Sequence, residues 1–180
     1  MKKLSALFLT LVLLMSAVPV AFAENAAANT TTLTTTVPSA SYVLNIPADQ
    51  EIPFGQERTE IGNITITDGK NFASGKNVKV TTSYEPFAAE NVSTTIPYRL
   101  EGVGISSGKR YSTSVDSLTF MGKSDGTVAE KVRWACNQLV IGQTCEMDYV
   151  VMYIQSSAWG KALAGDYKST ITFTSEVVVE

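Results

Sequence analysis

The chain has 180 residues, with 14 basic and 17 acidic side chains, a formal net charge of −3 and no histidine. The absence of histidine excludes Ser-His-Asp and Cys-His nucleophile systems, HExxH metalloproteases and imidazole-ligated zinc centres. The lack of a basic excess argues against nucleic-acid binding, which depends on neutralising phosphates.

The first 23 residues have the three parts of a secretory signal peptide. Residues 1–3 include two lysines, and residues 4–20 are mostly apolar. In Ala21-Phe22-Ala23, small residues occupy the −3 and −1 positions relative to the expected cleavage site. We therefore expect cleavage between Ala23 and Glu24. The alternative is an uncleaved anchor, but the apolar stretch barely reaches the roughly 20 residues that span a bilayer. The sequence thus predicts an exported protein, secreted or at the cell surface, with no stable membrane insertion after cleavage.

The exported chain is predicted to have a tail and one domain. Residues 24–40 are rich in Ala, Asn and Thr and are expected to form a flexible segment. Within it, residues 30–36 are nearly all threonine, whose branched Cβ favours extended backbone, so this block is either a polar edge strand or a linker. Residues 41–180 are expected to form a single β-sandwich domain.

Alternating apolar and polar residues dominate from residue 41 onward and predict strands. The runs cover 42–46, 63–67, 77–84, 96–100, 118–120, 132–134, 147–154 and 167–179. Only 156–163 is predicted as helix, with Ser156 or Ser157 as N-cap and Gly165 as the stop. Strands joined by short turns, without alternating helices, indicate an all-β, antiparallel β-sandwich with one short connecting helix.

Two of these runs have distinctive patterns. Residues 147–154 are apolar on both faces, which is typical of a central strand. The last run is the most regular and predicts a core strand with one buried face, composed of Tyr167, Ile171, Phe173, Val177 and Val179.

Cys136 and Cys145 are the only cysteines. Their spacing fits neither a Cys-x-x-Cys redox motif nor a zinc pair. In an exported protein we expect a disulfide that closes a loop of about ten residues, and the alternative is two free thiols.

Two places are candidates for an exposed contact with a partner. Leu139, Val140 and Ile141 are three adjacent apolar residues inside the cysteine loop, and they form either a contact surface or a short packed strand. Tyr111 is isolated among polar and charged residues, so it is either an exposed contact or an ordinary loop tyrosine.

The sequence predicts no catalytic, cofactor-binding or metal-binding residues. Among the acidic residues close in sequence are two pairs, Glu57 with Glu60 and Glu146 with Asp148, and nothing marks either pair as a general acid and base. The Asp-Gly pairs at 68–69 and 125–126 lack the repeated oxygen ligands of a calcium loop and are predicted to be turns. We therefore expect a protein without enzymatic activity or cofactor.

Three segments carry a resemblance to known proteins. The run Ala-Gly-Asp-Tyr at 164–167, followed by alternating threonines and apolar residues to 174, resembles the closing strand of bacterial pilin-like and spore-coat-U-like proteins. Ile-Pro-Tyr-Arg-Leu at 96–100 and Ile-Pro-Phe-Gly at 52–55 are similar to two other segments of those domains. The resemblance implies an immunoglobulin-like sandwich and no catalytic residue. The cysteine pair departs from it, because fimbrial subunits commonly bridge an early strand.

The expected function is that of a secreted or cell-surface structural subunit or adhesin-like domain. Its expected partners are other surface proteins, or copies of itself joined through strand edges. The alternative is an extracellular carbohydrate-binding module of β-sandwich type, whose glycan would stack on exposed aromatic side chains. A subunit should self-associate, whereas a sugar binder should be monomeric with exposed coplanar aromatic rings.

Overall fold

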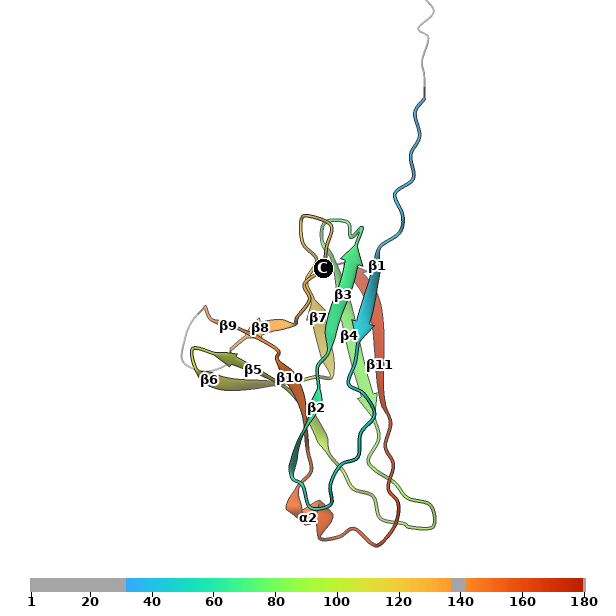
Figure 1. Ribbon diagram of the computed structural model, residues 1–180, viewed down its shortest axis with the longest axis vertical. Helices are drawn as coiled ribbons and strands as arrows, with labels where there is room; N and C mark the ends of the chain where they lie inside the picture. The colour runs from blue at the N-terminus through green and yellow to red at the C-terminus, as the bar shows by residue number, and fades with distance from the viewer. Residues whose placement is uncertain (1–31, 137–141, 180) are drawn as a thin grey trace, which may run out of the picture. The chain divides into compact units, whose positions relative to one another are not determined.

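The computed structural model describes residues 32–136 and 142–179, and in these the chain is mostly β-strand (Figure 1). The chain divides into residues 1–36 and 37–180, and the helices and strands that the structure describes all lie in the second part. They are β1 (Ser41–Asn45), β2 (Arg58–Gly62), β3 (Thr65–Lys70), β4 (Lys76–Tyr84), β5 (Arg99–Ser106), β6 (Lys109–Ser114), β7 (Ser117–Phe120), β8 (Arg133–Ala135), β9 (Thr144–Glu146), β10 (Tyr149–Tyr153), α2 (Ser156–Trp159) and β11 (Ile171–Val179).

Every strand pairing is antiparallel. One sheet has the order β2-β10-β5-β6 and another the order β11-β4-β7, while β1 pairs with β3 and β8 with β9. Alternate residues of these strands meet in one buried cluster, which includes Val80 of β4, Phe120 of β7, Met152 of β10 and Ile66 of β3. The predicted all-β antiparallel sandwich with one short helix is therefore confirmed.

The central position predicted for the 147–154 run is also confirmed. β10 lies between β2 and β5, and Val150, Val151 and Met152 are all buried. A strand with neighbours on both sides and cover on both faces has no polar face, which explains its continuous apolar sequence.

Three strands have no counterpart in the alternation pattern. β2, β6 and β9 have the sequences RTEIG, KRYSTS and TCE, which are mostly polar. β6 follows β5 through the two-residue turn Ser107-Gly108, in which both residues have positive φ, as tight hairpin turns require. These strands form because a neighbour supplies hydrogen-bond partners, not because they bury an apolar face.

The helix differs from its prediction. α2 ends at Trp159, with Gln155 as N-cap and Gly160 as C-cap, so the expected span of 156–163 and the stop at Gly165 were wrong.

The turn predicted at Asp68-Gly69 was also wrong, because both residues lie inside β3. Residues 32–36 form no strand, which favours the linker interpretation for that part of the threonine block.

The last strand is paired as expected but buried differently. β11 pairs with β4 in unbroken register from Ile171, opposite Tyr84, to Val179, opposite Lys76. Ile171 and Phe173 are half-buried, whereas Val177 is 40% and Val179 67% exposed. The predicted burial of these two valines was wrong because β11 is the outermost strand of its sheet, where no further strand covers its side.

Candidate functional site

The most distinctive surface is the edge formed by β11, at the outer side of β4 (Figure 1). Thr82 of β4 donates its N–H to Asp116 beside β7, at 3.0 Å. Because backbone groups alternate in direction along a strand, the preceding residue, Thr81, directs its N–H and C=O toward β11, where it lies opposite Thr174. The even-numbered residues of β11 therefore bond to β4.

The odd-numbered residues of β11 consequently direct their backbone groups away from β4. These are Ile171, Phe173, Ser175, Val177 and Val179. Across residues 32–136 and 142–179, no strand pairs with that side of β11. The result is a nine-residue strand with an unpaired edge.

The neighbouring edge belongs to β1. The Tyr42 hydroxyl of β1 donates to Ser175 Oγ of β11 over 2.9 Å. Tyr42 also packs beside Phe72, with ring centroids 6.1 Å apart. This contact between two side chains joins the edges near the middle of β11 without using the backbone groups of Ser175.

A cleft continues from this edge past the beginning of β11. It consists of two adjoining hollows of about 520 and 270 Å³, which share Gln50, Ile52 and Phe87 as lining residues. Ile96 lines the first hollow, and Ile61 and Met152 line the second; all three are buried core residues. Side chains of the sandwich core thus form part of the cleft wall.

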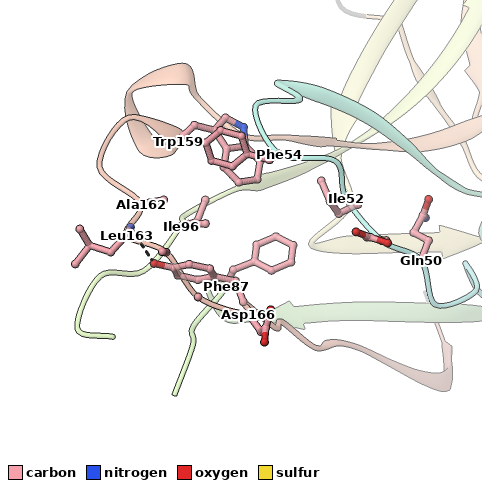
Figure 2. A pocket seen from close by; sticks show the side chains of 13 residues that line it. Gln50, Ile52, Phe54, Phe87, Ile96, Trp159, Ala162, Leu163 and Asp166 are labelled. Carbon is pink, nitrogen blue, oxygen red and sulfur yellow. Dashed lines mark hydrogen bonds between the residues drawn. The ribbon is translucent and has the colours of Figure 1, made fainter. Parts of the chain in front are cut away.

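An aromatic pair lies at the rim of the larger hollow, where Figure 2 shows Phe54 and Trp159 together. Phe54 is 81% exposed and meets Trp159 edge-on, with centroids 5.3 Å apart and planes at 65°. Gly55 has φ +79° in the turn that follows Phe54, and Trp159 Nε1 donates to the Gln56 carbonyl at 3.1 Å. The turn and α2 together hold the two rings in place.

Hydroxyl groups fix part of the wall of the smaller hollow, which Tyr98 and Ser169 line. Ser169 Oγ donates to the Glu85 carbonyl at 2.7 Å, so the Tyr98 hydroxyl, also at 2.7 Å, donates to Ser169. Burial raises the pKa of Tyr98 above its ordinary value, and the hydrogen bond with Ser169 offsets part of that rise. The Tyr98 phenol therefore remains a proton donor at neutral pH and holds the chain just before β11.

The two predicted contact sites lie away from this edge or outside the described residues. Tyr111 is half-buried in β6, opposite Gly104, so it is part of a strand and not of a loop. The second predicted contact site, formed by Leu139, Val140 and Ile141, lies outside the residues that the structure describes. The same holds for the predicted cleavage site between Ala23 and Glu24. Sequence reasoning missed the cleft, and Phe54 entered that reasoning only within the resemblance of residues 52–55 to pilin-like domains.

Cys136 and Cys145 are bonded, with Cα atoms 5.7 Å apart, as the predicted disulfide requires. The bond joins the residue after β8 to the middle of β9, and Cys145 is fully buried.

Replacing both cysteines with serine is expected to lower the free energy of unfolding by about 2.7 kcal/mol, because an open loop of about ten residues has more entropy in the unfolded chain. Denaturant unfolding of the variant measures the loss. Reduction of the parent protein is the matched control and should give a similar loss. Unchanged stability in both would contradict this role of the bond.

Neither a metal site nor a membrane-spanning helix is present in the described parts of the chain. No group of three or more Cys, Asp or Glu side chains there is placed to hold a metal ion. The one helix in residues 32–136 and 142–179 is a single turn of four residues, too short to span a bilayer. Comparisons with protein-family models, curated proteins and solved structures find no match to this chain.

Proposed function

We propose that this protein is an exported structural subunit of a cell surface that has no catalytic activity and associates with copies of itself through strand edges. The observation that carries the proposal is the unpaired edge of β11 beside a cleft whose wall includes core side chains. Unpaired strand edges template association with other chains, and monomeric proteins usually block them with lysine, proline, a bulge or a covering segment.

Two further features support the exported setting. The first 23 residues have the pattern of a signal peptide. The Cys136–Cys145 bond is of a kind that persists in oxidising compartments and is rare in the cytosol. A small sandwich stabilised by a disulfide suits a subunit that functions outside the cell.

Light scattering coupled to size-exclusion chromatography tests the proposal on the exported, disulfide-bonded protein. The expected result is a molar mass that rises with concentration above that of one subunit, and cross-linked species larger than the monomer after brief chemical cross-linking. A single monomeric species from micromolar to millimolar concentration would overturn the proposal.

A carbohydrate-binding module is the second candidate, and the Phe54–Trp159 pair beside the carboxylates of Glu51 and Asp166 is the feature that supports it. Because the two rings meet at 65°, only one of them can lie flat against a sugar ring. Screening the monomer against a set of glycans, with Trp159→Ala as control, distinguishes this candidate. Saturable glycan binding that the substitution abolishes would favour it over the subunit.

A further inference from the structure

β11 lacks the features that usually protect a strand edge. It contains no proline, lysine or arginine, and its register with β4 has no bulge. Glu176 is its only charged residue, and three valines follow. Long, regular strands with high β-propensity and little charge are the ones that pair with another chain.

The strand is also complementary to itself. In an antiparallel pair of two β11 strands, the odd-numbered residues of one copy must face odd-numbered residues of the other, because only these have free backbone groups. If Ser175 of one copy lies opposite Ser175 of the other, every residue of β11 has a partner in the second copy. Val179 then lies opposite Ile171 of the second copy, and Val177 lies opposite Phe173.

Charge selects the same register. With Ser175 at the centre, Glu176 lies opposite Thr174 of the second copy, and the two carboxylates are kept apart. Centring the pair on Glu176 instead would place like charges directly opposite each other, which destabilises a strand pair. The Ser175-centred register also covers Val177 and Val179, the two exposed valines on the core-side face of the strand.

We propose that two copies of this chain associate by antiparallel pairing of β11 with β11 about a two-fold axis at Ser175, joining their β11-β4-β7 sheets into one. This inference rests on the proposed function and specifies which edge and which register are used. The occupant of the edge is a second copy of the same chain, since the odd-numbered residues that face each other match in polarity, apolar against apolar and Ser175 against Ser175, and the Glu176 carboxylates do not meet. A two-fold interface of this kind closes on itself and yields a dimer.

Cross-linking through an introduced cysteine tests the register. In a hydrogen-bonded antiparallel pair, opposite Cα atoms lie about 5.5 Å apart, within the range that a disulfide bridges. Ser175→Cys is therefore expected to form a covalent dimer on mild oxidation, with the Cys136–Cys145 bond left intact. Thr172→Cys is the matched control, because two such residues would lie six positions apart along the strands, about 20 Å, and should not cross-link.

A charge placed on β11, compared with one placed on β1, tests whether the β11 edge is used. Val177→Lys is expected to weaken the dimer on the order of tenfold or more, because the ammonium group would be buried against Phe173 of the second copy. Val43→Lys, at an equally exposed valine of β1, should leave the dimer unchanged. Unfolding midpoints close to that of the parent would show that both variants fold.

The outcomes separate this inference from the proposed function. If the parent self-associates but Ser175→Cys does not cross-link, or if Val43→Lys breaks the association and Val177→Lys does not, then β11 pairing is wrong and the subunit proposal stands. If the parent remains monomeric at all concentrations, both fail. Cross-linking at Ser175 together with loss of the dimer in Val177→Lys supports both.

Discussion

Replacing Phe120 with alanine is expected to lower the free energy of unfolding by about 3 to 5 kcal/mol. Phe120 ends β7, lies opposite Val78 of β4 and is fully buried in the cluster between the sheets. The substitution removes the apolar contacts of the ring and leaves a cavity that the surrounding strands fill only partly. Since whole-domain stability is about 5 to 15 kcal/mol, this single change removes a large share of it.

The measurement is the denaturant midpoint and slope of the Phe120→Ala variant against the parent. Phe54→Ala is the matched control, because it makes the same substitution at a ring that is 81% exposed. Its effect should stay within about 0.5 kcal/mol, as for most surface changes. Similar losses for both variants would contradict the assignment of Phe120 to the core and Phe54 to the surface.

Gly104→Ala is the second change for which we expect a large loss, of about 1 to 3 kcal/mol or more. A Cβ at Gly104 in β5 would collide with the backbone carbonyl oxygen of Glu146 in β9 and touch the Trp134 ring at 3.0 Å. A backbone atom in a paired strand cannot move aside as a flexible side chain can. The β8–β9 hairpin would therefore have to shift away from β5.

Gly160→Ala is the control for this prediction. Gly160 has φ −66°, which any residue adopts, and the nearest atom to an added Cβ is the Ser156 carbonyl oxygen at 3.6 Å. This variant should be as stable as the parent or slightly more so, because alanine restricts the unfolded chain. Thermal unfolding of both variants decides the point, and an equal response would show that β9 does not press on Gly104.

The sequence predicted most accurately the elements whose local pattern and tertiary environment agree. The alternation through Val78 and Val80 indicated β4, and the apolar run at 147–154 indicated the central strand β10, because each pattern reflects how many faces are covered. The two cysteines indicated the disulfide because a chain that is predicted to be exported and has a single pair leaves few alternatives.

The strands β2, β6 and β9 depended on their neighbours instead. Arg58–Gly62 has one buried residue, and it is a strand because β10 supplies its hydrogen-bond partners. The helix stopped at Trp159 for a similar reason, since the segment after it turns to form the wall of the cleft. Local propensity is a weak determinant wherever backbone partners come from distant segments.

The sequence by itself determined the class of the fold, because period-two alternation records which side chains can face a core. It also determined the absence of histidine chemistry. Only the tertiary structure decided that Val177 and Val179 are exposed, that core side chains line a cleft, and that β11 has a free edge. The physical reason is that alternation assigns a side chain to one face of its strand, whereas the exposure of that side chain depends on whether another strand lies beside it. The order of the strands in a sheet is set by contacts between residues far apart in the chain.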